Sequence, residues 1–155
     1  MKTTFPLSLA VLHGLVLSGA TPSRSKRHLD QLGSMIECRV GKGRWLSRLD
    51  YFDYGCYCGF GGSGAPLDRV DWCCRKHDVC YGKFESEGKC QWYEYPYWTL
   101  YSWSCAHGRY LSCSDPEDSC GRSICHCDKH LVECFSRAKY NPELKGINKA
   151  VMCKP

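Results

Sequence analysis

The chain has 155 residues, of which 14 are cysteines, and carries a formal net charge of +5 at pH 7. Four of its 21 basic residues precede His28 and all 16 acidic residues follow it, so the part from His28 onward sets 17 basic against 16 acidic side chains, a formal charge of +1. With this balance and no block of like charge, the composition gives no indication of a nucleic-acid partner.

The first 27 residues are predicted to be removed during secretion. Residues 1–20 combine an early lysine, an apolar run and small residues at the end, which is typical of a signal peptide. The run is too short and too interrupted for a membrane span, and no later stretch is apolar enough to be one. Residues 21–27, TPSRSKR, resemble a propeptide that ends at a dibasic site. Residues 28–155 are then expected to form one extracellular domain.

All the cysteines lie in that domain, and an even number in a secreted chain predicts a disulfide framework. A zinc site is disfavoured, because the C-C and C-x-C pairs lack the usual C-x₂₋₄-C spacing.

The domain opens with a predicted amphipathic helix over His28 to Cys38. Its apolar residues fall at helical spacing and form one stripe, made of Leu29, Leu32, Met35 and Ile36. Arg39 to Asp53 is a basic, glycine-broken link that ends in aromatic residues.

The next segment, Tyr54 to Gly64, reads YGCYCGFGGSG and contains five glycines. Glycine permits positive φ and lets the backbone approach a bound group closely. Hard cations such as calcium accept backbone carbonyls as ligands, and the carbonyls of Tyr57, Gly59 and Gly61 alternate by two along this loop. The loop holds no acidic residue, so it is not an EF-hand, and we expect a carboxylate from elsewhere to complete the site.

A second helix is predicted from an N-cap at Asp68 to about Phe84, with a stop near Gly88 and Asp71 in its first turn. It contains DWCCRKHDVCY, in which His77 and Tyr81 are four residues apart and share a face. Adjacent His and Asp side chains cannot pair on a helix. We therefore interpret His77 as a general base and Asp78 as the carboxylate ligand of the metal.

Cys90 to Cys105 encloses an aromatic segment, QWYEYPYWTLYSWS. Trp92, Tyr93 and Trp98 suit either a membrane–water interface or ordinary packing. The following residues, Tyr101 to Cys113, alternate in polarity around Gly108 and predict a two-stranded hairpin.

The last long helix is predicted to open at Asp115-Pro116, to extend to about Ala138 and to be ended by Asn141-Pro142, with an irregular, solvated tail beyond. Two cysteines seven residues apart lie on each long helix, close to two turns, so each pair shares a face. If the helices are antiparallel, Cys73 meets Cys134 and Cys80 meets Cys127. Asp128 then falls within a turn of His77.

The glycine loop and the His-Asp helix together closely resemble the calcium loop and catalytic helix of secreted phospholipase A2, and the pattern is most similar to the pancreatic-type, group I enzymes. The resemblance runs from His28 to Cys153. It implies a mainly α, disulfide-rich fold with three main helices: an N-terminal helix and two long antiparallel helices clamped by disulfides. A calcium-binding loop and a small two-stranded β-wing complete it.

The resemblance also implies roles for individual residues. His77 would activate water, and Asp128 would orient the imidazole of His77. Tyr81 and Tyr101 would donate hydrogen bonds to Asp128, and the Gly59 N–H would contact the oxyanion. Calcium would be held by Asp78 and the carbonyls of Tyr57, Gly59 and Gly61. The acyl chain would contact Leu29, Leu32, Ile36 and Phe135. The lipid phosphate would contact Tyr97. Gln31 matches the residue that anchors the free amino terminus.

Five further disulfides follow from the same resemblance, namely Cys38–Cys105, Cys56–Cys153, Cys58–Cys74, Cys90–Cys120 and Cys113–Cys125. The implied activity is calcium-dependent hydrolysis of the sn-2 ester of glycerophospholipids by a secreted monomer that binds a membrane or micelle surface without spanning it. The alternatives are a toxin on the same scaffold, or a non-catalytic protein that binds a receptor or matrix. Loss of His77, Asp78 or a loop glycine would favour the non-catalytic reading, and none is lost.

Overall fold

The computed structural model of the protein describes residues 28–41, 49–90, 98–117 and 119–154. The elements in chain order are α1 (His28–Val40), α3 (Arg69–Ser86), β1 (Trp103–Ala106), β2 (Tyr110–Cys113) and α4 (Cys120–Phe135), followed by the short helices η1 (Pro142–Leu144) and α5 (Lys149–Met152). This helix-rich architecture with one small sheet confirms the expected fold class. The predicted signal peptide and propeptide lie outside the described residues.

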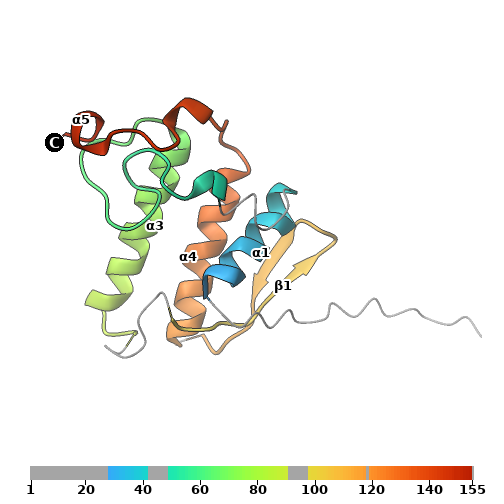
Figure 1. The fold of residues 1–155 in the computed structure, drawn as a ribbon. Coiled ribbons are helices and arrows are strands. Elements are labelled where there is room, and N and C mark those ends of the chain that lie inside the picture. Colours follow the sequence, from blue (N-terminus) through green and yellow to red (C-terminus); the bar gives the residue numbers. More distant parts are fainter. Residues whose placement is uncertain (1–27, 42–48, 91–97, 118, 155) are drawn as a thin grey trace, which may run out of the picture.

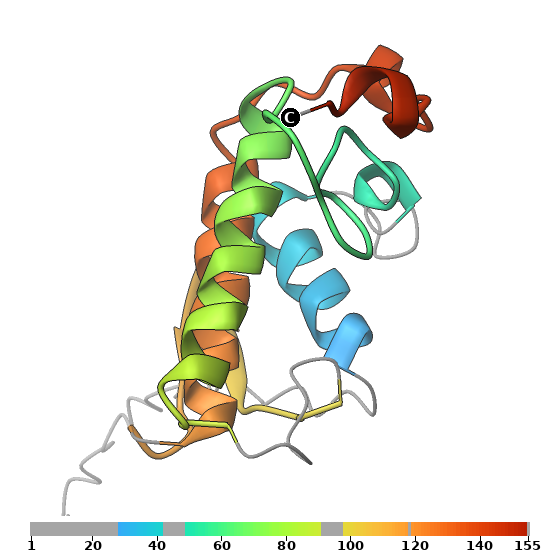
Figure 2. The ribbon, with the colours of Figure 1, turned by 90° about the vertical axis from the view of Figure 1, so that its left-hand side faces the viewer.

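The two long helices α3 and α4 lie side by side in both views (Figures 1 and 2). Disulfides join Cys73 to Cys134 and Cys80 to Cys127, with the two Cα atoms 5.8 Å apart in each case. A residue early in one helix is therefore bonded to a residue late in the other, which makes the helices antiparallel. The register derived from the seven-residue spacing is confirmed.

Helix α1 packs against α4 and β2 and buries the predicted apolar stripe unevenly. Met35 and Ile36 are buried, whereas Leu29, the second residue of the helix, is 42% exposed. The helix extends two residues past Cys38 and ends at Gly41, which has φ 75° and donates its N–H to the carbonyl of Glu37 at 3.0 Å. A glycine in the left-handed region is the usual way to close a helix.

Helix α3 begins and ends close to the predicted positions. The Asp68 carboxylate accepts the N–H of Asp71 at 2.9 Å, as expected of an N-cap, and Gly88 follows the last turn with φ 67°. The predicted hairpin is also present, with Trp103 opposite Cys113 and Ala106 opposite Tyr110 in an antiparallel pair.

The other five disulfides are the same pairs that the family resemblance implied. They are Cys38–Cys105, Cys56–Cys153, Cys58–Cys74, Cys90–Cys120 and Cys113–Cys125. No cysteine is left free. Through these disulfides the glycine loop, the hairpin and the C-terminal tail are attached, directly or through one another, to α3 and α4.

The predicted start of the last helix at Asp115-Pro116 is wrong, because α4 begins at Cys120. The Asp115 carboxylate accepts the backbone N–H of Ser102 beside the hairpin, and the Pro116 carbonyl accepts the N–H of Ser119 to close a turn. Ser119 then caps the helix by accepting the N–H of Arg122 at 3.1 Å. The cap contact formed by serine and the competing contact of Asp115 move the boundary four residues along.

The prediction of an irregular tail is wrong in part, whereas Lys139, Lys145 and Lys154 are exposed as expected. The tail folds into η1 and α5 and covers the segment that precedes the glycine loop. Lys145 donates its ammonium to the carbonyls of Leu49 and Phe52, and the Lys149 ammonium lies 3.2 Å from the Asp53 carboxylate. Lysines that the sequence suggested were solvated thus hold two separate chain segments together.

Candidate active site

The site centres on a buried carboxylate, Asp128, that accepts three hydrogen bonds. His77 Nε2 lies 2.7 Å from Asp128 Oδ1, and the same oxygen accepts the Tyr81 hydroxyl at 2.7 Å. The Tyr101 hydroxyl donates to Oδ2 at 2.6 Å. Asp128 is fully buried, so these donors replace the water that an ionised carboxylate would otherwise need. All four residues that the resemblance assigned to this network are brought together.

The contact with Asp128 determines which nitrogen of His77 can act as a base. A carboxylate accepts but does not donate, so the Nε2 that faces it carries the imidazole proton. Nδ1 is then left as an acceptor. The His77 side chain is 11% exposed and borders a cavity, so it has limited access to solvent.

Tyr101 is held in place by α1 as well as by Asp128. The Gln31 side chain is buried and pairs with both backbone groups of Tyr101, donating to the carbonyl at 2.5 Å and accepting the N–H at 3.3 Å. Burial raises the pKa of Tyr101 well above its usual range, and the neighbouring Asp128 charge adds to the rise. The hydroxyl therefore stays protonated and remains a donor. The amino-terminal helix is thus linked to the catalytic carboxylate through one tyrosine.

The glycine loop is tied to the first turn of α3 by Asp71. Its carboxylate is fully buried and accepts three backbone N–H groups, from Cys56 at 2.9 Å, Tyr57 at 2.8 Å and Leu67 at 2.9 Å. A Cβ at Gly55 would lie 2.4 Å from the Asp71 carboxyl carbon, so only glycine fits there. Sequence reasoning interpreted Asp71 only as a first-turn acid, because nothing in its spacing reveals which backbone folds over it.

Asp78 faces the cavity without a compensating charge. It is half-buried, and in the described part of the chain no ion pair or hydrogen bond holds its carboxylate. Burial raises its pKa to about 6, and the Asp71 charge adds to this while His77 opposes it. Such a carboxylate beside a carbonyl-rich glycine loop suits a hard cation that offsets the burial cost.

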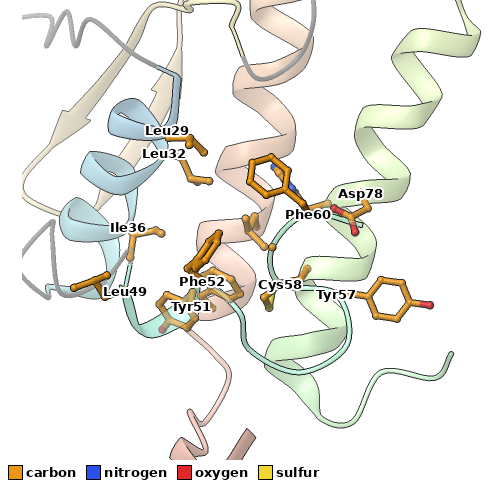
Figure 3. A pocket seen from close by; sticks show the side chains of 15 residues that line it. Leu29, Leu32, Ile36, Leu49, Tyr51, Phe52, Tyr57, Cys58, Phe60 and Asp78 are labelled. Carbon is orange, nitrogen blue, oxygen red and sulfur yellow. A yellow bond between two sulfur atoms is a disulfide. The ribbon is translucent and has the colours of Figure 1, made fainter. Parts of the chain in front are cut away.

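The remaining metal ligands would have to come from the backbone. Among the described residues no group of three or more His, Cys, Asp or Glu side chains could hold an ion. The loop has positive φ at Gly59 (139°) and Gly61 (69°), conformations that favour glycine. The Tyr57 side chain points away from Leu32 and Ile36 (Figure 3), and its hydroxyl donates to the Gly64 carbonyl at 2.6 Å. What Tyr57 can offer a cation is therefore its carbonyl.

A largely apolar cavity of about 380 Å³ adjoins His77 and Asp78. The predicted acyl-contact residues Leu29, Leu32, Ile36 and Phe135 all line it, the first three on α1 (Figure 3). The stacked rings of Tyr51 and Phe135, 4.0 Å apart, form part of its wall. Tyr97, expected to reach the phosphate, lies outside the described residues, as do Trp92 and Tyr93.

Sequence reasoning missed several residues of this cavity, namely Leu49, Tyr51, Phe52, Phe60 and Leu131. Three of them are large apolar side chains left open to solvent, with exposed fractions of 62% for Leu49, 56% for Phe52 and 74% for Phe60. Leu49, Tyr51 and Phe52 sit in the stretch read as a link, where the aromatic cluster was a usable signal.

A family model described as Phospholipase A2 matches residues 29–145. The match spans both the loop and the two helices of the site. None of the described helices is long and apolar enough to cross a membrane.

Proposed function

This chain belongs to the phospholipase A2 family, and from that premise we propose that it is a secreted, calcium-dependent esterase. Its substrate would be the sn-2 ester of glycerophospholipids at lipid–water interfaces, and its products a fatty acid and a lysophospholipid. The observation that carries the proposal is that His77, held by the buried Asp128, and the half-buried carboxylate of Asp78 line the same apolar cavity.

The chain's own residues suit the attack of water on an ester. His77 Nδ1 would take a proton from water as its oxygen bonds to the ester carbon, and would return that proton to the lysophospholipid oxygen as the ester bond breaks. Asp128 would stabilise the imidazolium formed in between, since it already accepts from Nε2. The backbone N–H of Gly59 would donate to the carbonyl oxygen as its charge develops.

Calcium fits the loop by its donor set, namely the Asp78 carboxylate with the carbonyls of Tyr57, Gly59 and Gly61. When bound, the ion would supply positive charge for the lipid phosphate and the ester carbonyl oxygen. The cavity would hold the acyl chain through Leu29, Leu32, Ile36 and Phe135, and Tyr97 is proposed to contact the phosphate.

The exposed apolar residues around the cavity mouth support binding to a lipid surface. Leu49, Phe52 and Phe60 adjoin the opening, so a membrane or micelle could cover them as an acyl chain enters. We further propose the pancreatic type, on the resemblance of the Cys90 to Cys105 segment, and a monomer with residues 1–20 as signal peptide and 21–27 as propeptide.

The test is fatty-acid release from mixed phospholipid vesicles, with calcium and with excess chelator. We expect release only with calcium, and a loss of about a thousandfold or more in His77→Gln because its general base is gone. His107→Asn removes a histidine outside the cavity and should retain full activity. Full activity in chelator would contradict the calcium requirement, and an active His77→Gln would remove His77 from the mechanism.

A further inference from the structure

A pair of histidines lies on α4 outside the candidate active site. His126 and His130 are four residues apart, so they share one face of the helix. Their ring centroids are 6.3 Å apart and the planes are inclined at 46°. Neither ring lines the cavity beside His77 and Asp78.

The turn that carries this pair is rigid. Cys127, between the two histidines, is bonded to Cys80 of α3. Asp128, also between them, is fully buried and accepts three hydrogen bonds on the opposite face of α4. The backbone beneath the two imidazoles is therefore already ordered, and a ligand that bridges them would not have to order it.

We infer that His126 and His130 form a binding site for a late first-row divalent metal ion such as zinc, separate from the calcium loop. Two imidazoles at i and i+4 on a helix can reach one ion, since metal–nitrogen bonds are about 2.0–2.1 Å long. His130 is exposed, so its ring can rotate toward His126 without unpacking the core. Water would occupy the remaining coordination positions.

The chemistry around the pair separates its ligand from that of the calcium loop. Imidazole nitrogen suits zinc, copper and nickel, whereas carboxylate and carbonyl oxygen suit calcium. Burial lowers the pKa of His126, and the nearby charges of Arg122 and Lys129 lower it further, which favours the neutral ring that coordinates a metal ion. These positive charges also repel a metal ion. The negative charge of Glu117 has the opposite effect, and the Lys129 ammonium lies 3.9 Å from the Glu133 carboxylate.

The space beside His130 supports a hydrated ion. His130 borders a groove of about 300 Å³ between α3 and α4, which Trp72, Lys76 and one edge of His77 also line. Because neither His126 nor His130 lines the cavity that would take the acyl chain, an ion held by the pair should not obstruct lipid entry.

The test is calorimetric titration of zinc into the purified protein, with all disulfides formed and calcium saturating to occupy the loop. One zinc per chain should bind, and His126→Gln and His130→Gln should each weaken it by at least about tenfold. His107→Asn, which removes a histidine outside the pair, should leave the affinity unchanged. No zinc binding, or binding that survives both substitutions, would overturn the inference.

A second readout needs no variant. The imidazole carbon-bound proton resonances of His126 and His130 should shift together on addition of zinc, while lipid hydrolysis at saturating calcium stays the same. Shifts confined to His77, or a loss of hydrolysis that more calcium reverses, would place zinc in the calcium loop instead and overturn the inference. The titration and the resonance shifts are measured without lipid, so they are independent of whether the protein is a phospholipase, and only the hydrolysis readout rests on the proposed function.

Discussion

Asp128 is the residue at which three parts of the chain meet. It belongs to α4 and accepts hydrogen bonds from His77 and Tyr81 of α3 and from Tyr101 ahead of β1. Both of its oxygens accept from these side chains. A substitution that keeps the shape of the carboxylate but removes its charge can therefore separate the two contributions.

Asp128→Asn should lower activity by about a hundredfold, less than His77→Gln does. The amide oxygen can still accept from His77 and Tyr81, and the Tyr101 hydroxyl can rotate to accept from the amide N–H. The imidazole stays oriented, but the charge that stabilises its protonated form is lost. The turnover rate on vesicles at saturating calcium measures this. A loss as large as that of His77→Gln would show that the charge, rather than the orientation, is what Asp128 contributes.

Asp78 predicts a pH dependence of stability in the metal-free protein. Its folded-state pKa is raised to about 6 from 3.8, so protonation favours the fold. That contribution is fully present below the unfolded pKa and is lost as the pH rises through about 6. In chelator, Asp78→Asn should therefore be more stable than wild type at pH 7.5, by about 1–2 kcal/mol after allowance for partial solvent screening, and equal to it near pH 3.5.

Denaturant unfolding at the two pH values measures this difference. Added calcium should stabilise the wild type alone at pH 7.5, because the variant lacks the charged ligand. An equal gain in both proteins would mean that Asp78 is not the carboxylate that binds the ion.

The glycine loop contains no helix or strand of its own and takes its shape from α3. Asp71 accepts two backbone N–H groups of the loop and a third from Leu67 just after it. The disulfides Cys56–Cys153 and Cys58–Cys74 join the loop to the tail and to α3. A loop built this way can present carbonyls in a fixed direction without regular structure of its own.

Asp71→Asn should therefore weaken calcium binding by about tenfold and cost about 1–3 kcal/mol of stability. An amide cannot accept at all three N–H groups, and its own N–H₂ would face a donor. Calcium titration and denaturant unfolding measure the two effects, with Glu87→Gln, at an exposed surface ion pair, as the control. An unchanged calcium affinity would mean that the disulfides alone hold the loop.

At the scale of the whole molecule, the disulfides offset the stability that is lost because the core leaves a cavity open. Seven bridges could contribute roughly 2–4 kcal/mol each, and less where their loops overlap. The exposed mouth and the buried Asp128 network share α1, since Leu29 and Leu32 line the cavity while Gln31 holds Tyr101. Changes at the start of α1 should therefore reach both the lipid-facing surface and the catalytic pair.

Removal of residues 21–27 should control activity on aggregated lipid. We expect secretory cells to cut after Arg27, at the basic sequence RSKR, and to release a chain that starts at His28. A Lys26→Ala, Arg27→Ala variant should keep its catalytic residues, hydrolyse dispersed lipid weakly and fail on vesicles, because no free amino group exists to order the start of α1. Sequencing the secreted amino terminus and comparing both substrates test this. An uncut variant that is fully active on vesicles would refute the link.

The sequence by itself determined the elements whose signals are local. The apolar stripe of α1, the Asp68 cap of α3 and the turn at Gly108 each depend on neighbours within a few residues. It also determined the register of α3 and α4 for antiparallel helices, because cysteines seven apart on each helix can then form both bridges at once. The direction itself was decided by the structure, since parallel helices with the same spacing would pair Cys73 with Cys127 and Cys80 with Cys134. From that register followed the proximity of Asp128 to His77.

Only the tertiary structure decided what depends on contacts between distant segments. The role of Asp71 requires the loop to fold over it, and the role of Lys145 requires the tail to return to Leu49 and Phe52. The start of α4 moved to Cys120 because Asp115 bonds to Ser102 in another segment instead of capping a helix. Local sequence carries no information about such partners, since a carboxylate or an ammonium can satisfy its hydrogen bonds equally well with water until the fold brings a backbone group to it.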